Sequence, residues 1–399
     1  MKNTSSFTGL VLVVGTVVSI VAGAGCGGDG AGPMLGGADP LAQRAYVVSQ
    51  EHGDLTVIDL PSLNLIARVP TLGVGNHMAE LNADFSKAYV SSPDTNEVIV
   101  VDTRKLEVVK RIKMAAYPTH LTLSRDGKLL AVMCEQDNAV AFIDVATDTG
   151  VKFLSGFYTP HFMRFARDGR TAYVANMNAH HITRVDLPSM TISDEIALDG
   201  MTVPTMAPDE GGFADAQIAH DGVLYAADRA SGRVLVYDTI VQKKLPEFSV
   251  GKRPWIVYAE HPFTKLPLRH LVPNFADQTV SLIDGLARTA MAALPGDSEA
   301  YGVNYSSLAP NKAFVMNRVR EDIAVVDTAR GEITGRIAVG GNTETASTTP
   351  DGRWVVAAVS SANKVVVLDA QTNRIVKSFE GLGKYPWSVT IPNGQNYCH

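Results

Sequence analysis

Cysteine is scarce in this sequence, with three in 399 residues, and no CxxC or CxxCH pair occurs. A fold that depends on disulfides and a covalent haem-attachment site are therefore excluded. No basic run occurs, and 35 Lys+Arg against 41 Asp+Glu give a net charge of -6, which argues against a nucleic acid partner. The sequence also lacks GxSxG, HExxH and phosphate-loop motifs, so we assign no catalytic residue and do not favour an enzyme.

The first 43 residues differ in composition from the rest. Lys2 precedes an uncharged apolar run over residues 7–25, and a Gly-rich stretch follows Cys26. A cleaved secretory signal, an uncleaved anchor and a lipoprotein signal all fit this pattern. Ala24-Gly25-Cys26 resembles the bacterial lipobox, although Gly23 stands where Leu is usual. We therefore expect a signal peptide over 1–25, a lipid-anchored linker over 26–43, and a periplasmic or surface protein held to a membrane through Cys26.

The remainder, residues 44–399, is built from one repeated phrase. An apolar strand, a polar gap and a second strand that ends in Asp recur eight times, as in AYVVSQEHGDLTVID (45–59) and AYVSSPDTNEVIVVD (88–102). The final aspartates are Asp59, Asp102, Asp144, Asp186, Asp238, Asp284, Asp327 and Asp369. Their spacing of 42 to 52 residues is typical of a four-stranded propeller blade. Each Asp is expected to accept backbone N–H groups in the turn that follows it.

Further strands and turns complete each blade and close the ring. Asp-Gly or Asn-Gly pairs between apolar strands predict hairpins in which both central residues have positive φ. The chain ends with an inner strand, 388–391, and begins with the second strand of a blade at residue 44. The two ends therefore share blade one. The sequence predicts an all-β, eight-bladed β-propeller, with seven blades as the alternative.

The phrases Ala45-Tyr46-Val47, Ala172-Tyr173-Val174-Ala175-Asn176 and Val250-Gly251-Lys252-Arg253-Pro254 resemble the YVTN-type propeller repeat. The resemblance covers about residues 44–394 and implies a periplasmic or surface propeller. Related propellers include the haem-binding domain of cytochrome-type nitrite reductases and its maturation lipoproteins, which are eight-bladed. Lactonase-type and amine-dehydrogenase propellers are further relatives by fold.

The repeat register places several histidines at one mouth of the central channel. His77, His120 and His161 fall at the entry of inner strands, and Trp255, Glu344 and Trp387 occupy matching positions. Ligands of propellers usually gather at such a mouth. The candidate ligand-binding residues are His77, His120, His161, Asp215, Trp255, Glu344, Trp387 and His52. Side chains that merely fill a water-lined channel are the alternative to a binding site.

Imidazole and carboxylate together suit a transition metal or a haem-like cofactor. The metal set that we expect is His77, His161 and Glu344. An insertion over residues 199–214 lies on the same face, and its Met201 and Met206 also suit copper. It is either a lid or a solvated loop.

Three functions follow from these features. The first is a non-catalytic binding or scaffold lipoprotein that takes a protein or a small molecule at the channel mouth. The second is a haem- or metal-binding periplasmic protein in cofactor handling or redox. The third is a lactonase-like hydrolase, which would need a divalent metal or an acid–base pair on the same face.

Overall fold

The computed structural model describes residues 39–259 and 268–397. The expected signal peptide, residues 26–38 of the expected linker with Cys26, and Cys398 and His399 lie outside these residues. Within them, no helix is both long enough and apolar enough to pass through a bilayer. The 3₁₀ segment η1 (Pro40–Gln43) precedes blade one, its Leu41 is buried, and the carbonyl of Gln43 accepts from Leu60 N of that blade.

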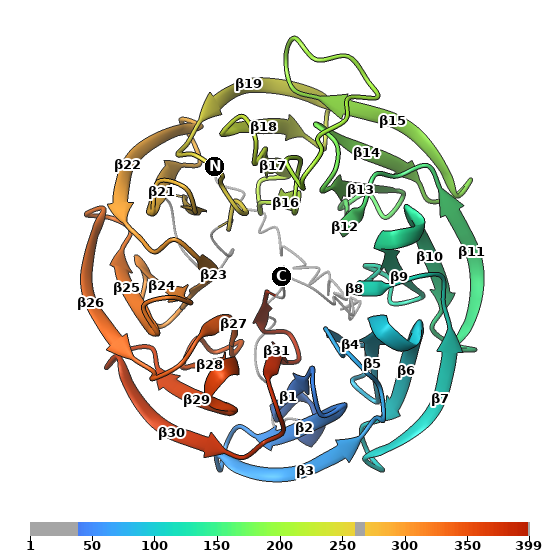
Figure 1. Ribbon diagram of the computed structural model, residues 1–399, viewed down its shortest axis with the longest axis vertical. Helices are drawn as coiled ribbons and strands as arrows, with labels where there is room; N and C mark the ends of the chain where they lie inside the picture. The colour runs from blue at the N-terminus through green and yellow to red at the C-terminus, as the bar shows by residue number, and fades with distance from the viewer. Residues whose placement is uncertain (1–38, 260–267, 398–399) are drawn as a thin grey trace, which may run out of the picture.

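Eight sheets stand in a ring around a central channel, which confirms the eight-bladed propeller (Figure 1). Blade one comprises β31 (Pro386–Thr390), β1 (Arg44–Ser49), β2 (Asp54–Asp59) and β3 (Asn64–Pro70). Blade two comprises β4 (Ala79–Leu81), β5 (Lys87–Ser92), β6 (Glu97–Asp102) and β7 (Glu107–Lys113). Blade three comprises β8 (Pro118–Leu123), β9 (Leu129–Cys134), β10 (Ala139–Asp144) and β11 (Thr149–Ser155). Blade four comprises β12 (Pro160–Phe165), β13 (Thr171–Asn176), β14 (His181–Asp186) and β15 (Thr191–Ala197).

The second half of the ring follows the same plan with two exceptions. Blade five comprises β16 (Gln217–Ile218), β17 (Val223–Ala227), β18 (Arg233–Asp238) and β19 (Lys243–Ser249). Blade six comprises β20 (Arg269–Asn274), β21 (Thr279–Asp284) and β22 (Thr289–Pro295), with single bridges from Pro254 and Tyr258 in place of an inner strand. Blade seven comprises β23 (Ala300–Tyr305), β24 (Lys312–Asn317), β25 (Asp322–Asp327) and β26 (Glu332–Ala338). Blade eight comprises β27 (Thr343–Thr348), β28 (Trp354–Val359), β29 (Lys364–Asp369), β30 (Arg374–Glu380) and an added inner strand, β32 (Gln395–Asn396).

The two chain ends close the ring as predicted. Strand β31 pairs antiparallel with β1, and Val389 lies opposite Val47. The chain then continues past this closure, where β32 pairs with β27 and Tyr397 is buried. Closure leaves no gap between the first and last blades, so every inner strand faces the same channel.

The core lies between the blades. Strand side chains alternate, so Tyr46 and Val48 of β1 join a cluster with blade two, whereas Ala45 and Val47 join a cluster with blade eight. One such cluster lies at each of the eight blade interfaces. Cys134 is fully buried in the cluster of blades two and three and is a free thiol, and its burial raises its pKa to about 12.

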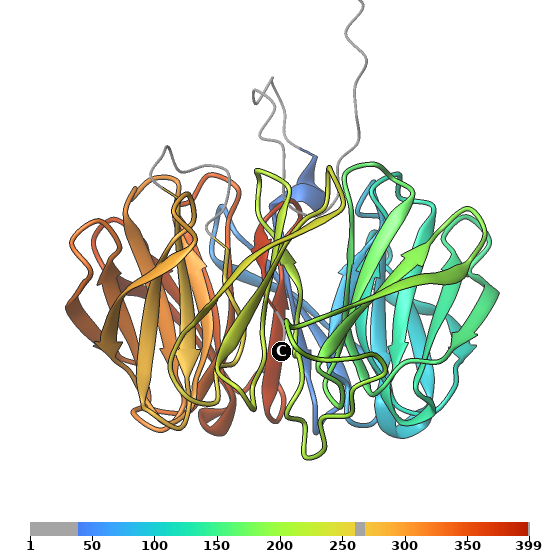
Figure 2. The same cartoon turned by 90° about the horizontal axis from the view of Figure 1, so that it is seen from above.

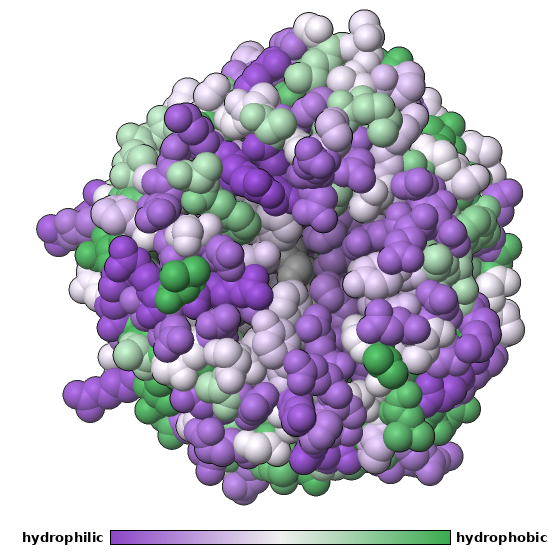
Figure 3. All heavy atoms as spheres, viewed as in Figure 1, coloured by the Kyte–Doolittle hydropathy of each residue, from purple (hydrophilic) through white to green (hydrophobic). Residues whose placement is uncertain are grey.

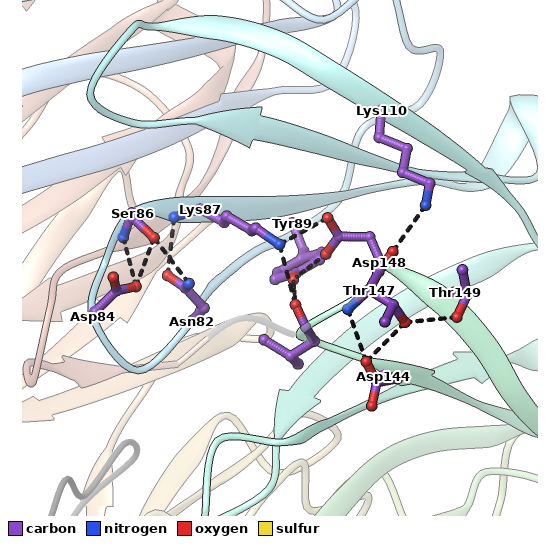
Figure 4. Close-up of polar contacts among 11 residues, drawn as sticks. Asn82, Asp84, Ser86, Lys87, Tyr89, Lys110, Asp144, Thr147, Asp148 and Thr149 are labelled. Carbon is purple, nitrogen blue, oxygen red and sulfur yellow. Dashed lines mark hydrogen bonds and ion pairs between the residues drawn. The ribbon is translucent and has the colours of Figure 1, made fainter.

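Polar contacts add to this packing at the outer part of the blades. The hydroxyl of Tyr89 donates to Asp148 Oδ1 at 2.6 Å, and Lys87 Nζ lies 2.8 Å from the other oxygen of the same carboxylate (Figure 4). Tyr225 makes a similar contact, from its hydroxyl to the carbonyl of Gly285 in the next blade. In blades two and five, the Tyr of the repeated phrase therefore links its blade to a turn of the following one.

The turns confirm one prediction and correct another. All eight repeat aspartates accept a backbone N–H group two or three residues further on, as expected. The hairpin turns were expected to have positive φ at both central residues, and this was wrong. At Asp126-Gly127 and Asp168-Gly169 only the glycine has a positive φ, of 71° and 64°. The aspartate keeps an ordinary φ because its carboxylate accepts the N–H group of residue 128 or 170.

Candidate functional site

The candidate site lies at the mouth of the channel on the face that carries the loops between the second and third strands of the blades. These loops include η2 (Pro93–Thr95), η3 (Glu135–Asp137) and η4 (Ser360–Ala362). Figure 2 shows η1 at the opposite rim, and Figure 3 shows that the face with these loops is hollowed at its centre and mostly hydrophilic around the hollow. The inner strands begin at this mouth, and the predicted histidines lie near the first residues of these strands.

A β-bulge marks the point where most of these inner strands enter the mouth. The pairing register shifts between Pro118 and Leu121 in β8, and between Pro160 and Phe162 in β12. Similar shifts occur in β23, β27 and β31, beside Tyr301, Glu344 and Trp387 respectively. A bulge turns a side chain out of the usual alternation of a strand. It therefore gives residues such as His120 and His161 directions that simple alternation does not predict.

Three imidazoles from successive blades form a row. The Nε2 atoms of His77 and His120 are 3.1 Å apart, and the rings of His120 and His161 have centroids 4.2 Å apart. His120 is almost fully buried, and His161 is buried as well. Burial and the nearby His161 lower the pKa of His77 to about 3, so that ring is neutral at neutral pH. Neutral imidazoles are the form that binds metal ions.

Glu135 joins this row, and the sequence did not point to it. It opens η3 in the loop after β9, and its Oε1 lies 3.7 Å from Nδ1 of His120. Ligand atoms of His120, Glu135 and His161 all lie within 4.8 Å of one another. Burial raises the pKa of Glu135, and the charge of His161 opposes that rise. The signal that could have identified Glu135 is that it follows Cys134, the last residue of the strand paired with the one carrying His120.

His120 and His161 each use one ring nitrogen for a polar contact outside the group of three ligand atoms. His161 Nδ1 lies 2.8 Å from the carbonyl oxygen of Ala214, which can only accept, so Nδ1 carries the proton. His120 Nε2 faces Nε2 of His77. The arrangement leaves Nε2 of His161 and Nδ1 of His120 as the atoms able to coordinate. Hydrogen bonding of the second nitrogen is the usual way in which proteins orient a metal-binding imidazole.

The opposite arc of the mouth is aromatic and cationic. Trp255 stacks on Phe275 at 5.4 Å and contacts Tyr301 at 5.3 Å. The guanidinium of Arg229 lies over the Trp255 ring, and that of Arg318 lies 5.5 Å from the Tyr301 centroid. This arc offers flat apolar surfaces beside positive charge, which suits a planar anionic molecule.

Glu344 and Trp387 connect the two arcs. Glu344 is fully buried, and its Oε1 contacts Arg318 Nε at 3.0 Å and Tyr385 Oη at 3.2 Å. Burial raises the pKa of Glu344 to about 7, although Arg318 opposes the rise. Trp387 lies between Tyr385, at 6.1 Å, and His77, at 5.6 Å. With the contact of His161 to Trp255 at 6.0 Å, the side chains form a continuous collar around the channel.

Of the predicted residues, the structure brings His77, His120, His161, Trp255, Glu344 and Trp387 into this collar. The expected metal set of His77, His161 and Glu344 differs from the group whose ligand atoms converge, since Glu344 lies with Arg318 and Tyr385. Asp215 is fully buried in an ion pair with Arg164. His52 is about half exposed, and its contacts are Arg68 and Asp54 of its own blade.

Comparisons with known proteins agree with this architecture. Residues 40–251 match the family described as "Domain of unknown function (DUF5074)", and residues 270–384 match the one described as "Cytochrome D1 heme domain". Phe275, Tyr301, Arg318 and Glu344 all lie in the second match. No curated protein matches the chain.

Solved structures show the same fold at low identity. A dihydro-heme d1 dehydrogenase, NirN, in complex with DHE is 18% identical with a TM-score of 0.75, over 90% of this chain and 76% of that one. Apo AztD from Citrobacter koseri is 12% identical with a TM-score of 0.60, over 87% and 96%. The hydrazine synthase of Kuenenia stuttgartiensis is 17% identical with a TM-score of 0.57, over 83% and 93%.

Proposed function

The chain belongs to the family described as DUF5074, and we propose that this member binds a divalent transition metal ion at the channel mouth. His120, Glu135 and His161 would be the ligands. The observation that carries the proposal is the approach of these three ligand atoms to within 4.8 Å of one another, in a family whose description assigns no activity.

The chemistry of these residues supports a zinc-like ion. Two imidazoles and one carboxylate are a usual set for Zn²⁺, and three protein ligands leave a position open for water or a further ligand. The donors are not thiolates, which would favour softer ions, since Cys134 is buried in the core with a raised pKa. The role would be metal binding or delivery by an exported propeller, without a catalytic step.

A direct binding measurement tests the proposal. Purified full-length protein should bind one Zn²⁺ per chain in competition with a chromophoric chelator. His161→Ala and His120→Ala should each weaken that binding by more than about 100-fold, since even the loss of an orienting partner costs about 10–100-fold. His52→Ala is the matched control, because His52 is an exposed histidine of the same chain. Equal affinity in the wild type and both site variants would contradict the proposal.

The aromatic and cationic arc favours a second candidate, a haem-like tetrapyrrole. Phe275, Tyr301 and Arg318 lie in the region that matches the cytochrome D1 heme domain, and they provide stacking surfaces and a positive charge. A histidine of the row would then bind the haem iron. Titration with haemin should then produce a saturable shift of the Soret band that is lost in His161→Ala. An unchanged haemin spectrum at a tenfold excess of protein would contradict this second candidate.

Export and a lipid anchor at Cys26 complete the proposed function. A lipid tether would hold the propeller at the envelope, where exported metal-binding proteins act. Metabolic labelling with a radioactive fatty acid should mark the wild-type chain and not Cys26→Ser. Labelling of both, or of neither, would argue against an anchor at this residue.

A further inference from the structure

The segment between β15 and β16, residues 199–214, is here called the strap. Figure 2 shows it extending from the rim opposite to η1. Its second half is folded onto blades four and five. Phe213 N donates to the carbonyl of Asn176 in blade four, and the carbonyl of Gly212 accepts from Arg229 N in blade five. The strap is therefore a structured bridge between two blades, and the solvated-loop alternative does not describe its second half.

The fit of the strap against blade four is close. A Cβ at Gly212 would lie 2.2 Å from the carbonyl oxygen of Ala179 and 2.4 Å from that of Asn176. Only glycine can occupy this position without displacing the backbone. Phe213 beside it is fully buried. These contacts fix the position of Gly212 and Phe213 against blade four.

The last residue of the strap, Ala214, and the residue after it, Asp215, both form hydrogen bonds with side chains of β12. The carbonyl oxygen of Ala214 accepts the Nδ1 proton of His161 at 2.8 Å. The carboxylate of Asp215 accepts two hydrogen bonds from the guanidinium of Arg164, one of them from Nε to Oδ1 at 3.1 Å. His161 and Arg164 belong to the same strand, and Ala214 and Asp215 are neighbours in the chain. Movement of either contact would therefore displace the other.

We propose that Arg164 and Asp215 are a positioning pair. Their contact holds the Ala214 carbonyl against Nδ1 of His161 and thereby determines which nitrogen of that ring can coordinate. The proposal rests on the proposed metal site and names a further part of it. With the carbonyl in place, Nδ1 carries the proton and Nε2 keeps its lone pair, so Nε2 is the nitrogen able to coordinate. Without it, the imidazole can rotate or adopt the tautomer with a proton on Nε2, which cannot coordinate through that atom.

The first test combines substitutions with zinc binding. Asp215→Asn in the full-length chain should weaken Zn²⁺ binding by about 10–100-fold, the usual cost of losing an orienting partner. In a His161→Ala background the same substitution should change the remaining affinity by less than about twofold, because the effect passes through that imidazole. Asp322→Asn, which breaks a comparable pair with Arg336 in blade seven, is the control and should leave affinity unchanged. An equal loss from Asp215→Asn in both backgrounds would mean a merely structural role and overturn the proposal.

The second test needs no metal, so it separates this proposal from the proposed function. Nitrogen-15 shifts of the His161 ring in the metal-free wild type should report a proton on Nδ1 alone. In Asp215→Asn they should report a mixture of the two tautomers. The same single tautomer in both proteins would overturn the positioning role. Absence of zinc binding by a wild type whose tautomer does depend on Asp215 would refute the metal site and leave the positioning role supported.

Discussion

His77 and His120 face each other with their Nε2 atoms 3.1 Å apart, although 43 residues separate them in the chain. The repeat interval between these blades, from Asp102 to Asp144, is 42 residues, so the contact joins nearly matching positions of adjacent blades. One ring must donate and the other accept, which requires an unprotonated nitrogen in the pair. The low pKa of His77 agrees with this requirement. Because adjacent blades pack side by side in the propeller, two histidines about one repeat apart in the sequence come into contact.

Removal of the Tyr89 hydroxyl should destabilise the interface between blades two and three. Tyr89→Phe loses a 2.6 Å hydrogen bond to the Asp148 carboxylate, and we expect a loss of about 1.5–3 kcal/mol in the free energy of unfolding, the usual value for a bond to a charged group. Chemical denaturation measures it. Tyr173→Phe is the matched control in blade four, because among the described residues its hydroxyl has no hydrogen-bond partner. Equal losses in the two variants would contradict the assigned role of Asp148.

Replacement of a repeat aspartate should act through its turn. Asp102 accepts the N–H groups of Arg104 and Lys105 at 2.9 and 2.8 Å, so Asp102→Ala should lower the free energy of unfolding by about 1–2 kcal/mol. Asp102→Asn keeps an acceptor oxygen and should cost less than about half as much. Urea denaturation of the three proteins tests this order. A neutral Asp102→Ala would show that the carboxylate does not stabilise the turn.

Acid should destabilise the fold partly through His270. Burial lowers the pKa of His270 from 6.5 to about 4, so below pH 6.5 the unfolded chain binds a proton that the folded chain does not. The stability associated with the neutral ring is fully present above pH 6.5 and is lost as the pH falls towards 4, by up to about 3 kcal/mol. His270→Leu should make the fall in stability between pH 7 and 4.5 shallower. An identical pH dependence in both proteins would contradict this assignment.

Ring closure should depend on β31. A chain that ends at Lys384 lacks both β31 and β32, exposes the edge of β1, and should aggregate without a cooperative unfolding transition. A chain that ends at Pro392 keeps β31 and should remain soluble and cooperative, with lower stability from the loss of the buried Tyr397. Size-exclusion chromatography and thermal unfolding distinguish the two. A soluble, cooperative chain ending at Lys384 would refute closure through the terminal strand.

Several features could be predicted because each depends on a pattern within one repeat. The eight copies of the repeated phrase predicted eight blades, and the inner strand near residue 390 predicted the shared blade. The entry positions of inner strands placed His77, His120 and His161 at one mouth. Neighbouring residues alone determine a strand, a turn and their period, so repetition of one phrase carries these features around the whole ring.

Tertiary structure alone decided which atoms meet. The bulges in β8 and β12 aim His120 and His161, the position of η3 brings Glu135 beside them, and the strap supplies the Ala214 carbonyl. The same geometry buries Asp215 against Arg164 and leaves His52 exposed, although both were predicted to lie at this mouth. These outcomes depend on how adjacent blades pack and where the backbone departs from regular pairing. The sequence by itself determined the ring and the face on which the histidines gather. Contacts between blades that are distant in the chain decided which side chains converge in the candidate site.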